Sequence, residues 1–275
     1  MRAAVVQINT TADRDRNLEV AERLVRAAAS DGAGLVVLPE KWPWLASGEQ
    51  QADGSETMDG PAMSAAGSWA SELGISLQAG SFTETATEGG LPSNTAVMFS
   101  PDGKVAATYR KIHMFDVDVA GVEYRESSFE RAGDETTVVT TGDAEVGMTV
   151  CYDLRFPELF RSLLEDGADT FTVPAAFTAT TGRAHWELLL RARAIENQAF
   201  VLAAGQVGHA TPEIESWGHS MIVDPWGEVL ALVEEGEGFA AADLDFDRQA
   251  STRAGLPALE HRRPGLFFRK TEALA

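Results

Sequence analysis

Cysteine, basic residues and long hydrophobic runs are all scarce in this sequence. The single cysteine among 275 residues, Cys151, excludes an internal disulfide framework and any zinc site built from several cysteines. No stretch approaches the roughly 20 apolar residues of a membrane-spanning helix. The N-terminal sequence MRAAVVQINTTADRD has too short an apolar segment for a signal peptide. We therefore expect a cytoplasmic protein that does not enter the membrane.

Acidic residues outnumber basic ones, with 42 Asp and Glu against 22 Lys and Arg and a formal net charge of -20. Such a surface repels a phosphate backbone, so we expect no nucleic-acid partner. The charge favours solubility. An anionic small molecule could still bind if the pocket itself supplied a cation.

Hydrophobic periodicity predicts strands that alternate with amphipathic helices, without a linker or an internal repeat. Turn signals at Pro-Asp-Gly and Asp-Pro-Trp-Gly predict two hairpins, which implies mixed sheets. We expect one α/β domain over residues 1–275, with a C-terminal tail from about residue 256. Residues 113–135 read as a looser polar stretch. The predicted helices are 15–30, 61–73, 155–166 and 183–198, and the predicted strands include 2–8, 34–40, 76–82, 170–174 and 199–207.

Cys151 stands at the end of the predicted strand EVGMTVCYD, shortly before a predicted helix. The simple interpretation of a lone cysteine there is a small buried core residue. The alternative is a nucleophile, because ligands of α/β folds bind at the carboxyl ends of strands and the positive end of a helix favours the thiolate. A nucleophilic thiol needs a base, yet none of the five histidines lies in a signature that would nominate it.

Glu40 and Lys111 occupy positions similar to that of Cys151. Glu40 ends the buried run GLVVLPE, and Lys111 ends the second strand of a predicted hairpin. Taken singly, these residues read as a capping or loop residue and as a solvated strand end. We expect the three strand ends to lie side by side in a sheet. A carboxylate base, an ammonium and a thiol would then form a set suited to acyl transfer.

Three segments, VVLPEKW, YRKIHMFD and GMTVCYDLRFPEL, resemble the three motifs of the nitrilase (carbon–nitrogen hydrolase) superfamily and occur in the family's order. AHWELLLRARAIENQ, GHSMIVDPWGEVLA and LPALEHRRP are similar to the branch that contains deaminated glutathione amidases and omega-amidases. The resemblance implies an α/β fold, a four-layer αββα sandwich with two mixed sheets, which forms a homodimer. It implies neither a metal nor any other cofactor.

By this resemblance, Glu40, Lys111 and Cys151 are catalytic. Glu40 would take the thiol proton as Cys151 attacks an amide carbonyl. The Lys111 ammonium and the backbone N–H of Tyr152 would stabilise the oxyanion. Protonated Glu40 would then give its proton to departing ammonia, and Glu40 would activate the water that hydrolyses the thioester.

The family has a second glutamate that orients the lysine and the substrate. This residue maps best onto Glu126 in YRESSFERAGDE, with Glu123 and Glu130 as alternatives. Without the resemblance, Glu126 would read as a solvated loop residue.

Arg155, Phe177 and Thr181 are the expected substrate-pocket residues, together with Tyr152. Arg155 offers a planar fork for a substrate carboxylate, although an ion pair with Asp153 or Glu158 is an equal alternative. Phe177 and Thr181, in PAAFTATTG, resemble pocket positions of these amidases and would otherwise read as ordinary loop residues.

Residues and resemblance together predict a cysteine-dependent amidase. It would hydrolyse the amide of a small carboxylate-bearing substrate of the α-keto acid type through a thioester, releasing ammonia. RARAIENQ and EHRRP favour deaminated glutathione amidase, and an omega-amidase acting on α-ketoglutaramate or α-ketosuccinamate is the alternative. Hydrolysis of N-carbamoyl compounds or nitriles is less favoured. A non-catalytic scaffold is also less favoured, because the Glu, Lys and Cys of the family are all present. A zinc deaminase would need paired cysteines.

Overall fold

Two six-stranded β-sheets form the centre of the computed structural model, which describes residues 1–86, 89–119, 121–263 and 266. The first sheet has the order β16 (Gly238–Asp243), β1 (Arg2–Gln7), β2 (Leu35–Val37), β3 (Ser76–Glu84), β4 (Ser93–Phe99), β5 (Val105–Arg110). The second has the order β15 (Val229–Leu232), β14 (Met221–Val223), β11 (Phe200–Gly205), β10 (Thr170–Ala175), β9 (Ala144–Met148), β8 (Val138–Thr141).

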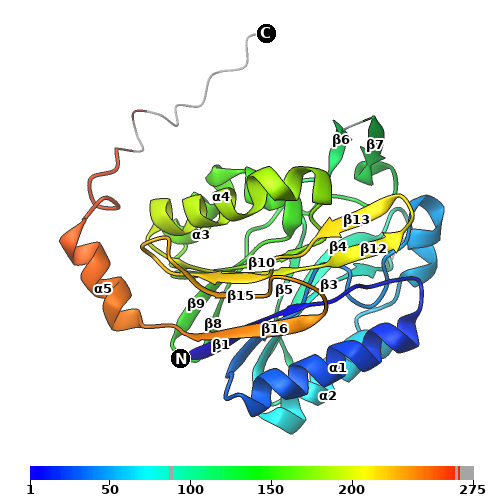
Figure 1. The fold of residues 1–275 in the computed structure, drawn as a ribbon, viewed down its shortest axis with the longest axis horizontal. Helices are drawn as coiled ribbons and strands as arrows, with labels where there is room; N and C mark the ends of the chain where they lie inside the picture. Colours follow the sequence, from blue (N-terminus) through cyan, green and yellow to red (C-terminus); the bar gives the residue numbers. More distant parts are fainter. Residues whose placement is uncertain (87–88, 120, 264–265, 267–275) are drawn as a thin grey trace.

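Helices cover the outer face of each sheet, as Figure 1 shows. Helices α1 (Arg14–Ser30) and α2 (Pro61–Leu73) lie on the first sheet, and α3 (Pro157–Glu165) and α4 (Ala179–Asn197) lie on the second. Helix α5 (Phe246–Gly255) follows β16 at the edge of the molecule. The predicted α/β fold with four layers and two mixed sheets is confirmed.

The alternation of side chains along the strands explains why the sheets are covered on both faces. In β1, Ala3 and Val5 point into the core between the sheets, whereas Ala4 and Val6 pack against the helices of the first layer. All four side chains are fully buried. A strand that is apolar on both faces requires a partner layer on each, and this need produces the sandwich.

Parallel crossovers bring the carboxyl ends of several strands to one end of the sandwich. The pairs β1–β2, β2–β3, β9–β10 and β10–β11 are parallel, and a helix joins each pair. The remaining strands of the two sheets pair antiparallel. A parallel bridge between Ile8 and Gln206 links the ends of β1 and β11, so the same end of both sheets is shared.

Several predicted boundaries differ from the structure. Helix α4 begins at Ala179 rather than 183. The expected helix over 155–166 is shortened to α3, and a break at Phe156 divides it from the 3₁₀ helix η3 (Cys151–Arg155). Pro157 causes this division, because proline is favoured at the first position of a helix and disfavoured inside one.

Short hairpins were missed or misread because their strands span only four or five residues, too few for an alternation to stand out. The polar stretch 113–135 contains β6 (Asp116–Val119), β7 (Val122–Arg125) and the 3₁₀ helix η2 (Glu126–Ser128). The expected strand over 199–207 ends at Gly205, and the separate hairpin of β12 (Val207–Thr211) and β13 (Ile214–Trp217) follows. A further 3₁₀ helix, η1, spans Gly48–Gly54.

The expected C-terminal tail, from about residue 256, lies partly outside the described residues. Beyond residue 263, the structure describes only residue 266. In the part of the chain that the structure describes, no helix has both the length and the apolar character needed to cross a membrane.

Candidate active site

Glu40, Lys111 and Cys151 meet in one cavity of about 650 Å³. The expectation that they converge is correct, but the expectation that they lie side by side in a single sheet is wrong. Glu40 follows β2 and Lys111 follows β5 in the first sheet, with β3 and β4 between them, whereas Cys151 follows β9 in the second sheet. Face-to-face packing of the two sheets at a shared end brings the three residues together.

The segment before Glu40 is positioned by unusually close contact with β3. Leu38 N–H donates to the carbonyl of Gln78 at 2.9 Å, and beyond it Pro39 lies against Gly80. A Cβ on Gly80 would come within 1.9 Å of the Pro39 carbonyl oxygen. Gly80 also has a φ of +49°, so this approach of the two segments needs glycine.

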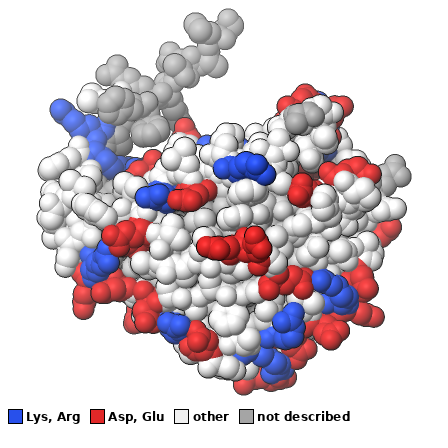
Figure 2. All heavy atoms as spheres, viewed as in Figure 1, with Lys and Arg blue, Asp and Glu red and all other residues white. Residues whose placement is uncertain are grey.

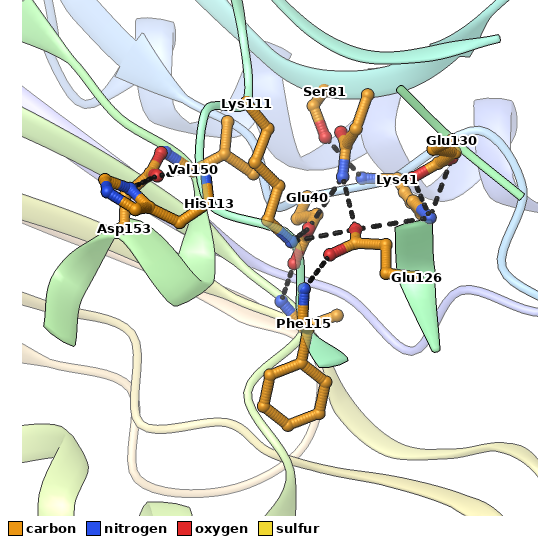
Figure 3. Close-up of polar contacts among 12 residues, drawn as sticks. Glu40, Lys41, Ser81, Lys111, His113, Phe115, Glu126, Glu130, Val150 and Asp153 are labelled. Carbon is orange, nitrogen blue, oxygen red and sulfur yellow. Dashed lines mark hydrogen bonds and ion pairs between the residues drawn. The ribbon is translucent and has the colours of Figure 1, made fainter. Parts of the chain in front are cut away.

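Both carboxylate oxygens of Glu40 are held by hydrogen bonds (Figure 3). Oε1 accepts from Lys111 Nζ at 3.0 Å and from Asn94 Nδ2 at 2.8 Å. Oε2 accepts from the backbone N–H of Ala176 at 2.7 Å. Glu40 is 3% exposed, so its carboxylate has a fixed orientation away from bulk water.

Lys111 is a buried ammonium between two carboxylates. Its Nζ donates to Glu40 and, at 2.9 Å, to Glu126 Oε1. Burial by itself lowers the pKa of Lys111, but the negative charges of Glu126 and Glu40 outweigh it and raise the pKa well above its ordinary value. Lys111 is therefore charged at any pH at which the protein works.

Glu126 is the one of the three candidate glutamates that contacts Lys111. Glu123 is exposed and pairs with Arg125 at 2.7 Å, while Glu130 is buried and pairs with Lys41 at 3.0 Å.

The carboxylate of Glu126 stays ionised. Its Oε2 also accepts from the N–H of Phe115 at 2.7 Å. Burial raises the pKa of Glu126, but the positive charges of Lys111 and Lys41 lower it to about 2.

Cys151 begins η3 with a backbone φ of +49°, in the left-handed region that residues other than glycine rarely adopt. Burial, followed by the charge of Glu40, raises the pKa of the thiol well above its ordinary value, and Lys111 offsets only part of this shift. Any preference for the thiolate at the start of a helix is therefore outweighed by burial and by Glu40. The thiol is protonated and needs a base to become a nucleophile.

Tyr152 places its backbone N–H beside Cys151. Tyr152 lies in the first turn of η3, where a backbone N–H has no acceptor within the helix and can be offered to a ligand. The Tyr152 ring packs edge-on against Phe115 and Phe156, with centroids 5.0 and 5.3 Å away.

Asp153 and His113 form a connection that sequence reasoning missed (Figure 3). The Asp153 carboxylate is fully buried. It accepts from Tyr109 Oη at 2.7 Å, from Val150 N–H at 2.8 Å and from His113 N–H at 3.2 Å, and His113 Nδ1 lies 2.7 Å away. It thereby ties the turn that carries Cys151 to the segment around Lys111. The signal in the sequence that could have indicated this role was an aspartate within the largely apolar segment GMTVCYDLRF.

Arg155, Phe177 and Thr181 all line the cavity. The Arg155 guanidinium lies 5.0 Å from the Phe177 ring centroid and 5.9 Å from that of Tyr152. Neither expected ion pair, with Asp153 or with Glu158, is formed, and among the described residues no carboxylate lies within 4.0 Å of Arg155. Its polar neighbour is His185, with Nη1 to Nδ1 at 3.2 Å.

The sequence profile of the carbon–nitrogen hydrolase family matches residues 2–254. The chain belongs to this family. Its resemblance to the nitrilase superfamily is thus confirmed, and it is a hydrolase of carbon–nitrogen bonds other than peptide bonds.

Individual relatives agree with this assignment. The chain is 39% identical to a deaminated glutathione amidase of Bos taurus, over 96% of this chain and 82% of that protein. It is 37% identical to omega-amidase NIT2 of Danio rerio, over 97% and 96%. The crystal structure of the C. elegans NitFhit protein matches 97% of this chain with a TM-score of 0.90 and 36% identity, and the chain spans 66% of that longer protein.

Proposed function

We propose that the chain is a cysteine-dependent amidase for small carboxylate-bearing substrates of the α-keto acid type, with deaminated glutathione as the preferred substrate. The observation that carries this proposal is the contact of the Glu40 carboxylate with the Lys111 ammonium beside a protonated Cys151. The similarity to deaminated glutathione amidases supports the choice of substrate.

In the first half-reaction, Glu40 takes the thiol proton as Cys151 Sγ attacks the amide carbonyl carbon. The carbonyl electron pair moves to oxygen, where the Lys111 ammonium and the Tyr152 N–H stabilise it. Protonated Glu40 then donates to the amide nitrogen, the C–N bond breaks, and the amine leaves a thioester on Cys151. Raised thiol basicity makes the base necessary, since little thiolate forms without one.

In the second half-reaction, water replaces the amine. Glu40 takes a proton from water as the water oxygen attacks the thioester carbonyl. The Lys111 ammonium and the Tyr152 N–H stabilise the second oxyanion. The C–S bond breaks, the sulfur regains the proton from Glu40, and the acid leaves. Glu126 takes no proton, because the neighbouring lysines lower its pKa to about 2. Its role is to hold Lys111.

The cavity supports a substrate with a carboxylate and some length. Arg155, stacked on Phe177 and without an acidic partner in the described part of the chain, provides a fork for the carboxylate. In deaminated glutathione, the amide nitrogen belongs to cysteine, so the amine released is cysteinylglycine. The release of ammonia expected from the sequence therefore applies only to an ω-amide. The volume of about 650 Å³ favours the longer substrate, and the similarity to omega-amidase NIT2 keeps α-ketoglutaramate as the second candidate.

The test measures 2-oxoglutarate, which both candidate substrates yield, and ammonia, which the ω-amide, the nitrile and the N-carbamoyl compound release but deaminated glutathione does not. Wild type and Cys151→Ala are compared on deaminated glutathione, α-ketoglutaramate, a simple nitrile and an N-carbamoyl amino acid. We expect turnover that depends on Cys151 and is fastest with deaminated glutathione. Faster turnover of α-ketoglutaramate would make the chain an omega-amidase and not a deaminated glutathione amidase. Turnover of only the nitrile or carbamoyl compound would refute the substrate class, and inactivity on all four would favour a scaffold.

We also propose a homodimer that uses the outer face of α4. Leu188 and Ile195 on α4 and the nearby Trp226 are 69%, 50% and 57% exposed, which supports a second copy as their cover. Light scattering should give twice the chain mass of 29.5 kDa. Leu188→Asp should give the monomer mass, and Val105→Asp, at an exposed site on β5, should leave the dimer intact. A monomeric wild type would contradict this assembly.

A single domain over residues 1–275 and a cytoplasmic location remain our proposals. The inter-sheet core, which takes side chains from both sheets, supports one domain, and limited proteolysis should release only the tail. A reducing compartment keeps a lone thiol unoxidised, which supports the cytoplasm, so cell fractionation should recover the protein with cytoplasmic markers.

A further inference from the structure

Lys41 is a buried cation in the cavity wall that the mechanism above does not use. Its side chain is only 11% exposed. Its Nζ lies 3.0 Å from the carboxylate of Glu130 and 4.0 Å from Glu126 Oε1 (Figure 3). No sequence signal indicated a role for it, because a lysine after Glu40 reads as solvated.

The backbone at Lys41 is held in an unfavourable conformation. Its φ is +52°, which costs a residue with a side chain about 1 kcal/mol or more relative to glycine. Its N–H donates to Ser81 Oγ at 3.1 Å, which fixes this turn on β3. Neighbouring residues of an extended chain point in opposite directions, yet Glu40 and Lys41 both line the cavity. The left-handed turn is what allows this.

Glu126 and Glu130 are placed on one turn so that Lys41 bridges them. The N–H of Glu130 donates to the carbonyl of Glu126 at 2.9 Å, and Thr83 Oγ1 donates to Glu130 Oε1 at 3.2 Å. Both carboxylates are turned inward, Glu130 being 2% exposed. Without the Lys41 ammonium, two carboxylates would face each other in a poorly hydrated site.

The charges therefore alternate along a chain of contacts, from Glu130 through Lys41, Glu126 and Lys111 to Glu40. Lys111 is the member that the proposed mechanism uses at the oxyanion. Its position depends on a fixed and ionised Glu126, and one side of Glu126 faces Lys41.

We propose that Lys41 is a positioning residue, which keeps Glu126 ionised and in place and thereby keeps Lys111 at the oxyanion site. This inference rests on the proposed amidase function. Lys41 itself touches no reacting atom in the proposed mechanism.

The charged groups facing Glu126 set the direction of the pH effect. They are Lys111, Lys41, Glu40, Glu130 and Asp116. Loss of Lys41 removes one of the two cations that lower the pKa of Glu126. That pKa then rises, Glu126 takes a proton at higher pH, and the acid limb of the kcat profile moves to higher pH.

The experiment compares Lys41→Met and Lys41→Arg with wild type. In Lys41→Met, we expect kcat to fall about tenfold or more with little change in KM, and the acid limb to move up by about one pH unit. Lys41→Arg retains the charge and should restore the acid limb. Lys104→Met is the matched control, because that lysine is 82% exposed and pairs with Asp102 far from the cavity; it should behave as wild type.

A purely structural role makes a different prediction. If Lys41 only neutralises Glu130, then Lys41→Met/Glu130→Gln should recover stability, kcat and the acid limb together, and this result would overturn the proposal. We expect the double variant to recover thermal stability but to keep the kcat defect. An unchanged kcat and pH profile in Lys41→Met would also overturn it.

Alkylation of Cys151 by iodoacetamide provides a readout that needs no substrate. In Lys41→Met, we expect the midpoint of the alkylation rate against pH to move to higher pH. In Lys41→Arg, we expect that midpoint to return to the wild-type pH. If wild type hydrolysed no compound of the panel but this shift occurred, the proposed function would fail while the role of Lys41 stood. An identical alkylation profile in all variants would refute the role of Lys41, whatever the substrate.

Discussion

Removal of the Asp153 carboxylate should weaken the connection between the turn of Cys151 and the strand end at Lys111. Asp153 is fully buried. It accepts hydrogen bonds from the Tyr109 hydroxyl and from the backbone N–H groups of Val150 and His113, and it also contacts Nδ1 of the His113 ring. Asp153→Ala leaves the Tyr109 hydroxyl and the Val150 and His113 N–H groups without this acceptor. Each buried unsatisfied group costs about 1–3 kcal/mol, so a loss of about 4 kcal/mol in the free energy of unfolding is expected.

Asp153→Asn should cost less, about 1–3 kcal/mol. Its oxygen can keep the bonds from Tyr109 and Val150, and its amide can donate to His113 Nδ1 if the ring changes tautomer. Only the N–H of His113, the longest of these bonds at 3.2 Å, then loses its acceptor.

Urea unfolding measures these stability differences, and keto-acid formation measures kcat. Because Val150 precedes Cys151, we expect kcat to fall at least about tenfold in Asp153→Asn even where the protein is fully folded. Tyr109→Phe, which removes the hydroxyl that donates to Asp153 and accepts from the Ile112 N–H at 3.3 Å, should cost about 1–3 kcal/mol. An Asp153→Ala variant as stable and as active as wild type would refute the reasoning.

Four further outcomes are expected. Lys111→Met should lower kcat by about 10²–10³ or more, because it removes an oxyanion donor. Arg155→Gln should raise KM about tenfold with little change in kcat or thermal stability, because Arg155 has no ion pair among the described residues. The stability difference between wild type and Glu126→Gln should be constant near pH 7 and shrink as pH falls from about 4.5 to 2, because the folded-state pKa of Glu126 is lowered from 4.5 to about 2. With a net charge of -20 and acidic side chains spread over the face in Figure 2, the melting temperature should rise when salt is increased to about 1 M.

Each of these outcomes has a contrary result. Near-normal kcat in Lys111→Met would remove the lysine from the mechanism, and an unchanged KM in Arg155→Gln would leave the substrate carboxylate to another group. A stability difference that grows on acidification would mean that the pKa of Glu126 is raised by folding. A melting temperature that falls in salt would mean that attractive ion pairs outweigh the repulsion among acidic groups.

The alternation of strands and helices, the family and three chemically linked residues could all be predicted from the sequence. Strand and helix periods are local properties, so Val5 or Leu24 signals its own environment without knowledge of its partners. Polar hairpins such as 116–125 gave no comparable signal. Their strands span only four residues each, and tertiary contacts decide their pairing.

Glu40, Lys111 and Cys151 could be proposed as catalytic residues from the sequence, because each stands at or near a predicted strand end and within a segment that resembles a nitrilase motif. Only the folded chain shows that they approach from two sheets, that burial raises the pKa of the thiol, and that Arg155 lacks an acidic partner among the described residues. It alone identified Lys41 and Asp153. Their partners lie far away in the chain, 89 residues for Lys41 and Glu130 and 44 for Asp153 and Tyr109. Burial and electrostatic coupling arise from such distant pairs, and no local pattern encodes them.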